Sequence, residues 1–315
     1  MRILVTGAGG YIGSQTCKLL TQQGHEVVAY DVNDIPHKYY KTQVKKCYSL
    51  IDTYMLETVD AVVHVAATSL VGPSMKDPAL YYRNNIAHTL QLLERCLAAK
   101  MKTFVFASSA ACYGEPDEDV CHESMASEPC SPYGWSKKMM ETILQTYYDA
   151  YGFNSVSLRF FNVAGADSDG EMGQAANGTH IIAKAIERTI AGKGFVLNGN
   201  DFDTPDGTCV RDYVHVEDVA QGILNSIELL QRDSGAYTFN LGGKRGYSNL
   251  EIINTINEHT PLSIDIEYGP ARAGDPGSLI SDPSAANTML NWKATHNLDS
   301  IVKTAYNWYT KEEVS

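Results

Sequence analysis

The sequence lacks the features of several protein classes. No apolar run approaches the ~20 residues needed to cross a membrane, and no Cys-x-x-Cys or other metal-ligand spacing occurs. Acidic residues outnumber basic ones, and the net charge of −12 leaves no basic surface for nucleic acid. Internal repeats and low-complexity segments are also missing. These absences predict a globular protein with no metal, no membrane and no nucleic-acid partner.

The cysteines do not form a disulfide framework. There are seven of them, an odd number, and several stand in apolar surroundings that suit buried thiols. This usage is typical of a reducing compartment, so a cytoplasmic location is predicted. With 315 residues, of which 44% are hydrophobic, the chain can bury a large core in one or two domains.

A glycine-rich turn follows the first strand-like segment. The apolar run 3–5 predicts a buried parallel strand, and glycines follow at Gly7, Gly10 and Gly13. A helix is predicted over 11–23, where Gly24 ends it. The spacing allows a tight turn, close approach to a pyrophosphate and close packing of the helix, whose N–H groups would face the phosphates. The alternative interpretation is a glycine-rich surface turn.

A carboxylate stands where a dinucleotide site needs one. A second predicted strand over 26–30 ends at Asp31, 18 residues after Gly13. A carboxylate here accepts hydrogen bonds from ribose hydroxyls and repels a 2′-phosphate, so NAD is predicted rather than NADP. The alternative is an ordinary turn aspartate at the end of a strand.

Strand-like and helix-like segments alternate through the first half, which predicts an α/β fold with a Rossmann-type doubly wound parallel sheet. The predicted strands include 44–50, 61–66, 103–107 and 155–159, and the predicted helices 79–99 and 133–151. Long polar, glycine-rich loops after residue 162 predict a smaller C-terminal α/β substrate domain. We expect an NAD-binding domain over 1–163, to which 210–235 returns, and a substrate-binding domain over 164–209 and 236–315.

Tyr133 and Lys137 form the most informative pair. They are one helical turn apart, about 6 Å along the axis, and so share a face. A neighbouring ammonium, together with the positive nicotinamide, would lower the phenol pKa and make Tyr133 a base for a sugar hydroxyl. Ser108 and Ser109 end the strand 103–107, where α/β sheets bind ligands, and a serine hydroxyl there can relay the proton. The alternatives are an exposed helix face and turn serines.

Several longer motifs carry a family resemblance. Together with the glycine turn, they resemble the extended short-chain dehydrogenase/reductase family, and within it the UDP-sugar 4-epimerases. The motifs are Ser109-Ala-Ala-Cys-Tyr-Gly, Ser131-Pro-Tyr-Gly-Trp-Ser-Lys, Leu158-Arg-Phe-Phe-Asn-Val-Ala-Gly, the long stretch 199–216 and Pro270-Ala-Arg-Ala-Gly-Asp.

The resemblance implies an isomerase that holds NAD, oxidises UDP-glucose or UDP-galactose at C4, lets the 4-keto sugar rotate and reduces it on the other face. It implies that Tyr133 is the acid/base, Lys137 its activator and Ser109 the hydroxyl relay. It also implies a homodimer formed through the helices 79–99 and 132–151. The implied NAD contacts are Gly7, Gly10, Tyr11, Ile12, Gly13, Asp31, Val32, Val65, Ala66, Ala67, Ser69, Asn84, Ser108, Tyr133, Lys137 and Phe161. The implied UDP-sugar contacts are Ser109, Tyr133, Asn162, His180, Arg211, Arg272, Asp275 and Leu279.

The sequence departs from the family pattern in places. The segment 33–56 lacks the usual Gly-Asp-Ile adenine contact, and Ser69 stands where some relatives carry a lysine. Leu279 is of intermediate size where bulk at C2 of the sugar is sensed, which leaves N-acetylated hexoses open as substrates. Epimerisation of a UDP-uronate is a separate alternative. A sugar-nucleotide 4,6-dehydratase is a weaker alternative, because dehydratases place Asp-Glu where Ala110 and Ala111 stand. A non-catalytic NAD sensor is the alternative from another class.

Overall fold

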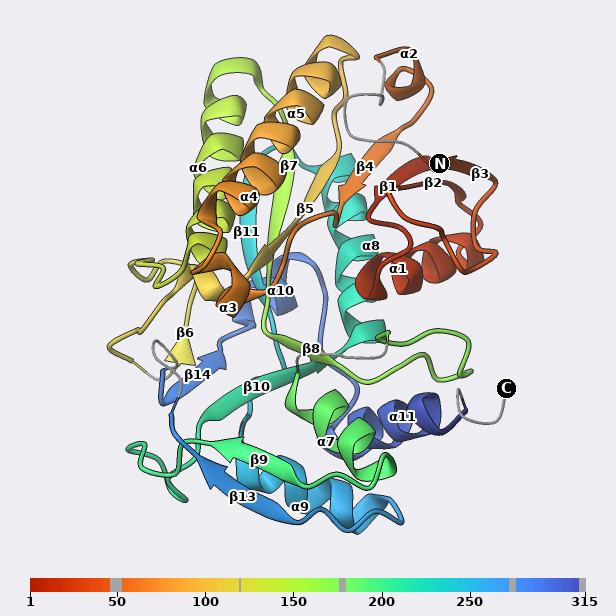
Figure 1. Cartoon of the computed structure of the whole chain (residues 1–315). Coiled ribbons are helices and arrows are strands. Elements are labelled where there is room, and N and C mark those ends of the chain that lie inside the picture. The colour runs from red at the N-terminus through yellow and green to blue at the C-terminus, as the bar shows by residue number, and fades with distance from the viewer. Residues whose placement is uncertain (46–52, 119, 176–179, 272–275, 312–315) are drawn as a thin grey trace.

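The computed structural model describes residues 1–45, 53–118, 120–175, 180–271 and 276–311. Its main body is a seven-stranded, fully parallel sheet in the order β11-β7-β5-β4-β1-β2-β3 (Figure 1). The strands are β1 (Arg2–Thr6), β2 (Glu26–Asp31), β3 (Thr42–Lys45), β4 (Ala61–His64), β5 (Phe104–Ser109), β7 (Ser155–Phe160) and β11 (Ala236–Leu241). The predicted Rossmann-type fold is therefore confirmed. Of the strand predicted over 44–50, residues 46–50 lie outside the described part.

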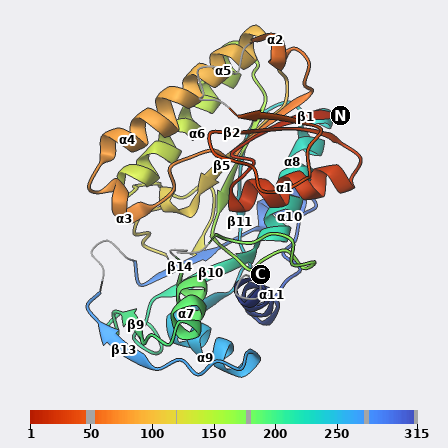
Figure 2. The ribbon, with the colours of Figure 1, turned by 45° about the vertical axis from the view of Figure 1, so that its right-hand side comes forward.

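Helices cover both faces of the sheet, which Figures 1 and 2 show as two separate layers. One layer holds α1 (Tyr11–Gln22), α8 (Val216–Arg232) and α10 (Ser284–Met289). The other holds α4 (Pro78–Tyr82), α5 (His88–Ala98) and α6 (Pro132–Tyr151), with the shorter α2 (Thr53–Leu56) and α3 (Val71–Ser74) beside it. Among the described residues, every helix is too short or too polar to span a lipid bilayer.

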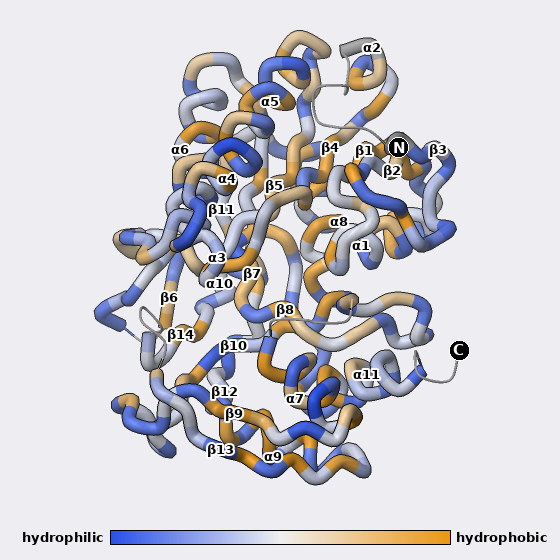
Figure 3. The backbone as a smooth tube through the Cα atoms, in the orientation of Figure 1, coloured by the Kyte–Doolittle hydropathy of each residue, from blue (hydrophilic) through white to orange (hydrophobic). Residues whose placement is uncertain are grey.

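The strand side chains alternate between two cores. Ile3 and Val5 of β1 join the cluster that includes Val219 and Ile223 of α8, whereas Leu4 joins the opposite cluster under α5 and α6. Figure 3 shows the hydrophobic colour following these central strands. Because both faces of these strands are buried, their sequences are apolar at successive positions and do not alternate between apolar and polar residues.

The predicted helix 79–99 is not one regular helix. It is α4, then a π-helical turn η2 (Arg83–Ala87), then α5. Within the wide turn, Asn84 donates to Thr68 Oγ1 (2.9 Å), and Asn85 donates to Thr68 O and to Ser136 Oγ (3.0 Å each). The predicted long helix is therefore confirmed as continuous helix over 78–98, with a π-helical turn where two adjacent side chains bind the same loop.

A second lobe lies below the sheet in Figure 1. Its mixed sheet contains β6 (Val120–Cys121), β8 (Asn162–Ala164), β10 (Val210–His215), β12 (Gly246–Ser248) and β14 (Ser278–Ser281); β9 (Phe195–Asn198) pairs with β13 (Ile266–Gly269). The helices α7 (Ile181–Ile190), α9 (Asn249–His259) and α11 (Leu298–Lys311) bury an isoleucine-rich core of their own. After β7 the chain enters this lobe through β8, and it returns through β10 into α8. These two crossings lie near the carboxyl ends of the strands of the large sheet.

Candidate functional site

The glycine turn forms a narrow backbone cradle. Gly7 has φ +74°, and its N–H donates to Tyr30 O (2.9 Å), which places the turn over β2. A Cβ on Gly13 would lie 2.0 Å from Gly7 O, so α1 packs directly on the turn. Gly10 caps α1 without a side-chain oxygen, and the first-turn N–H groups at Tyr11 and Ile12 have no intrahelical partners to bind. Such an end suits a phosphate.

Asp31 is fixed beside this cradle. Its Oδ2 accepts the Gly9 N–H and its Oδ1 the Asn33 N–H, each at 2.9 Å, and the side chain is buried. Each oxygen keeps a further lone pair for a ribose hydroxyl. Val32, which follows, is half exposed. The cradle and the carboxylate therefore fit a nicotinamide adenine dinucleotide.

The loop after β4 forms the opposite wall. The N–H groups of Val65 and Ala66 both donate to Thr6 O (3.2 and 3.1 Å), and Ala66 N would lie 2.7 Å from a Cβ on Gly7. Ala67 is partly buried and Ser69 is exposed further along this loop. Asn84 reaches the same loop through Thr68, as described above. This wall meets the glycine turn through backbone atoms, so larger side chains at the turn would close the cradle.

The three predicted catalytic residues come together at the carboxyl end of β5. Ser131 caps α6 by accepting the Gly134 N–H (3.1 Å), which sets Tyr133 in the first turn. A Cβ on Gly134 would lie 2.4 Å from Ala111 O, so only glycine lets α6 pack against the 3-10 turn η3 (Ala110–Cys112). This contact brings Ser109 to Tyr133, and the two side chains are hydrogen bonded. Sequence reasoning missed the role of Gly134.

Burial sets the charge state of this group. Burial raises the pKa of Tyr133 to about 12, and the hydrogen bond with Ser109 only partly offsets it. Burial lowers the pKa of Lys137 to about 8, against the opposing influence of Cys112 and Glu141. Lys137 Nζ donates to Ala107 O (2.6 Å) and lies 5.9 Å from the Tyr133 ring centroid. In the protein alone burial raises the phenol pKa, so the expected lowering by Lys137 and the positive nicotinamide together would require the bound dinucleotide.

Ser108 faces away from this group. It is buried, and its hydroxyl donates to Glu141 Oε1 (2.5 Å), which lies two helical turns beyond Tyr133 on α6. Its predicted cofactor contact would therefore come from its backbone.

Two of the residues predicted for the sugar nucleotide, Asn162 and Arg211, lie on the strands β8 and β10, which connect the lobes. The side chain of Asn162, on β8, is hydrogen bonded to the phenol of Tyr213, its register partner on β10. Arg211 of β10 is in register with Leu279 of β14, and Leu279 packs on the cluster that contains Phe161. His180 is partly buried at the start of α7. Arg272 and Asp275 lie outside the described residues.

Arg211 has the freedom that a diphosphate ligand requires. Its Nη1 donates to the carbonyls of Val210 (2.8 Å) and Gly277 (3.4 Å). Within the described ranges, the guanidinium forms no ion pair with a carboxylate. A half-buried arginine of this kind is suited to bind phosphate oxygens through its fork of donors.

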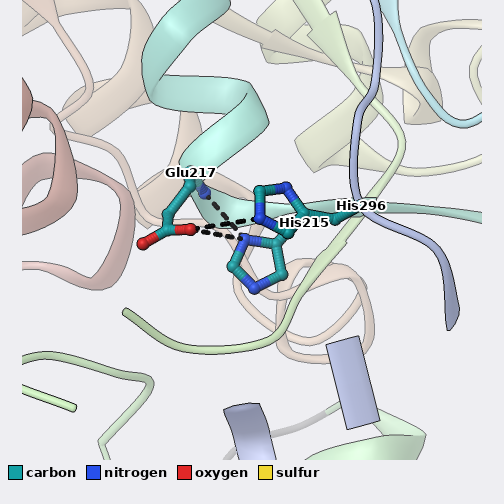
Figure 4. A group of neighbouring side chains, drawn as sticks. All are labelled: His215, Glu217 and His296. Atoms are coloured by element: carbon teal, nitrogen blue, oxygen red, sulfur yellow. Dashed lines mark hydrogen bonds and ion pairs between the residues drawn. The ribbon is translucent and has the colours of Figure 1, made fainter. Parts of the chain in front are cut away.

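Two further clusters contain potential metal ligands, and neither has the geometry of an ion site. His215 and His296 stack at 4.1 Å with their planes 19° apart, beside Glu217 (Figure 4). Nearly parallel rings cannot aim in-plane lone pairs at one ion, and both nitrogens of His296 already face carboxylates, which raise its pKa to about 9. In the second cluster, Lys18 Nζ lies within 3.0 Å of Asp167, Asp169 and Glu171 and supplies the cation itself.

Comparisons with known proteins agree with this geometry. The family model "NAD dependent epimerase/dehydratase family" matches residues 3–242. The UDP-glucose 4-epimerase of Lactobacillus helveticus is 39% identical over 98% of this chain and 97% of its own. Among solved structures, UDP-glucose 4-epimerase from Brucella ovis in complex with NAD has a TM-score of 0.91 and 37% identity, covering 97% of each chain. The enzyme from Bifidobacterium longum, in complex with NAD+ and UDP, has a TM-score of 0.92 and 32% identity, covering 99% of each. The chain, with its glycine cradle and its serine–tyrosine–lysine group, belongs to the NAD dependent epimerase/dehydratase family.

Proposed function

We propose that this protein is an NAD-dependent isomerase that interconverts UDP-glucose and UDP-galactose. The observation that carries the proposal is the assembly of Ser109, Tyr133 and Lys137 beside the dinucleotide cradle. The match to UDP-glucose 4-epimerases along nearly the whole chain supports it.

Tyr133, Ser109 and Lys137 each have a different part in moving the proton of the sugar hydroxyl. Bound NAD supplies the acceptor and donor of the hydride at the sugar C4. Tyr133 takes the proton of the C4 hydroxyl, directly or through Ser109, and returns it after the 4-keto sugar has presented its other face. Lys137, held by Ala107 O, keeps a positive charge near the phenol and favours its ionised form. No net oxidant is consumed, because the electron pair returns to the same carbon.

A dehydratase needs an acid and a base next to the relay hydroxyl, and the described structure offers neither there. The residues that follow Ser109 form the turn η3, in which Ala110 and Ala111 carry only methyl groups. Epimerisation of a UDP-N-acetylhexosamine or a UDP-uronate is the second candidate. It is favoured by similarity to the solved structures of the UDP-Glc/GlcNAc 4-epimerase from Campylobacter jejuni and of MoeE5 in complex with UDP-glucuronic acid.

The test is to incubate the purified protein separately with UDP-galactose, UDP-N-acetylgalactosamine and UDP-glucuronate and to resolve the products. We expect UDP-galactose to give UDP-glucose without consumption of added NAD. Turnover that requires stoichiometric NAD and leaves an oxidised sugar would contradict the proposal, as would turnover of the N-acetylated or uronate substrate alone.

Arg211→Ala is expected to raise the KM for the UDP-sugar by about 10-fold or more, since a charge-assisted contact contributes about 1.5–3 kcal/mol. The expected loss in kcat is smaller, because the guanidinium is not placed at the sugar C4. Steady-state kinetics measure both constants. Arg188→Ala is the matched control, because this exposed arginine near the end of α7 donates to Gly194 O, in the loop before β9. An unchanged KM in Arg211→Ala would remove this residue from the substrate site.

Asp31→Ala is expected to weaken NAD binding by about 10-fold or more and to narrow the preference for NAD over NADP. The substitution removes both the ribose acceptor and the charge that repels a 2′-phosphate. Titration of cofactor-stripped protein with each dinucleotide measures the effect. Asp60→Ala is the control. Asp60 also accepts a backbone N–H, from Arg2 at 2.7 Å, but it precedes β4 and so lies at the amino end of the strands, opposite the end where Asp31 lies. Equal losses in the two variants would contradict the assignment.

We also propose a cytoplasmic homodimer that pairs through α5 and α6. Exposed apolar side chains on α6 support this, since Trp135 and Met139 are each 41% exposed. The described cysteines form no disulfide with one another, which suits a reducing compartment. Residues 1–163 with 210–235 are proposed to bind NAD, and 164–209 with 236–315 the sugar nucleotide, although β11 adds to the first sheet. Sedimentation of the protein and of a Trp135→Glu variant tests the dimer.

A further inference from the structure

A buried ion pair lies on the face of α6 that carries Tyr133 and Lys137, further along the helix. Glu141 follows Lys137 by one more helical turn and is buried. Its carboxylate is bound bidentately by Arg159 of β7, with Nε to Oε1 at 3.0 Å and Nη2 to Oε2 at 2.7 Å. The hydroxyl of Ser108 on β5 donates to the same Oε1 at 2.5 Å. One carboxylate therefore joins α6, β5 and β7.

The arginine of this pair is itself held in place. Its guanidinium lies 4.7 Å from the ring centroid of Tyr113, whose hydroxyl donates to Asn240 Oδ1 (2.7 Å) on β11. Arg159 Nη1 also reaches Glu123 O at 3.5 Å. The pair is thus fixed on both sides, and removing one partner would leave a buried charge without compensation.

The other groups that act on Lys137 in the described structure are neutral, and Glu141 acts on it as one half of its ion pair with Arg159. His64, on β4, is buried, and burial lowers its pKa to about 3, so it is neutral. Burial raises the pKa of Cys112, in η3, to about 12, and that of Tyr133 to about 12, so both are neutral as well. Glu141 remains, and its charge opposes the loss of the Lys137 proton.

We propose that Glu141 is a positioning residue for the reaction. It keeps the buried Lys137 as an ammonium and fixes the end of β5, which carries Ser109, against α6. This inference rests on the proposed function, because it assigns Glu141 a part in the proton chemistry of that site. Sequence reasoning missed it, although the spacing 133, 137, 141 on one helix face was the available signal.

The test is the pH dependence of Lys137 and of turnover in Glu141→Gln. We expect the pKa of Lys137, followed by NMR of 13C-labelled lysine and assigned with Lys137→Arg, to fall by about one unit or more. The alkaline limb of kcat in the holoenzyme should move to lower pH by a similar amount. The sign follows from the charge: without Glu141, the ammonium loses its proton at a lower pH. An unmoved Lys137 titration would overturn the proposal.

Three further variants separate charge from structure. Glu141→Asp keeps the charge, so its alkaline limb should stay at the wild-type pH even if kcat drops. Asp149→Asn removes an exposed carboxylate from the same helix and should change neither readout. If Glu141→Gln does not fold, the double variant Glu141→Gln/Arg159→Gln leaves no unpaired charge. The pKa of Lys137 should still fall in it, by less than in Glu141→Gln because the cation of Arg159 is lost as well, and an unchanged pKa would overturn the proposal.

The two readouts also separate this proposal from the proposed function. If the wild type does not turn over any UDP-hexose, the proposed function fails, while the NMR titration still decides whether Glu141 sets the pKa of Lys137. A lowered melting temperature in Glu141→Gln with no change in either pH profile would make Glu141 a purely structural residue and refute the proposal.

Discussion

Tyr133→Phe is expected to lower kcat by at least ~10²-fold, the scale of general acid–base catalysis, while NAD stays bound. The variant loses the only atom of this side chain that can exchange a proton with the sugar. The ring should keep its place, because its edge contact with Tyr81, at 6.4 Å between centroids, does not involve the hydroxyl. The cost in stability is the hydrogen bond with Ser109, about 1 kcal/mol. Steady-state kinetics, the absorbance of bound cofactor and a denaturant titration measure the three quantities.

The control for this prediction is Tyr237→Phe. Tyr237 also donates a hydroxyl hydrogen bond, to Asp233 Oδ2 at 2.8 Å, but at the opposite end of the sheet. Its variant should keep wild-type kcat. Near-normal turnover in Tyr133→Phe, with the control behaving as expected, would remove Tyr133 from the proton chemistry and with it the proposed mechanism.

Gly13→Ala is expected to reduce NAD binding by at least ~10-fold and to lower the free energy of unfolding by about 1–3 kcal/mol, the usual cost of overpacking. The added Cβ would lie 2.0 Å from Gly7 O, 2.8 Å from Gly7 C and 3.0 Å from Ala8 Cα. All three are backbone atoms, so no side chain can move aside. The turn and the start of α1 must separate, which moves the phosphate-binding N–H groups out of position.

Gly194→Ala is the matched control for this substitution. A Cβ at Gly194 meets nothing within 4 Å, and the residue lies in the second lobe before β9. It should change neither cofactor binding nor stability by a measurable amount. Full retention of NAD in Gly13→Ala would show that the cradle is wider than the structure gives it, and the assignment of the phosphate site would fail.

The elements that the sequence predicted are those with a local signal. The first strand and α1 were visible because an apolar run, three glycines and a helical pattern follow one another directly. The pair Tyr133 and Lys137 was visible because an interval of four residues on a helix places two side chains on one face. The longer motifs gave the family and the expected roles of distant residues such as Arg211. Each of these signals lies within one element or one contiguous motif.

The contacts between distant elements could not be predicted in this way. Glu141 meets Arg159 and Ser108 only because α6, β7 and β5 pack together, and Gly134 matters only because Ala111 O lies 2.4 Å from where its Cβ would be. The π-helical turn at Asn84 and Asn85 likewise depends on the loop after β4.

By itself, the sequence determined the parallel α/β sheet, the glycine turn and the helical face of Tyr133 and Lys137. Backbone geometry repeats over a few residues, so it leaves a readable period in the chain. The tertiary structure decided which side chains join that face from elsewhere and which charges they carry. Burial raised the pKa of Tyr133 to about 12 and lowered that of Lys137 to about 8, and burial exists only once the lobes and layers have closed around the site.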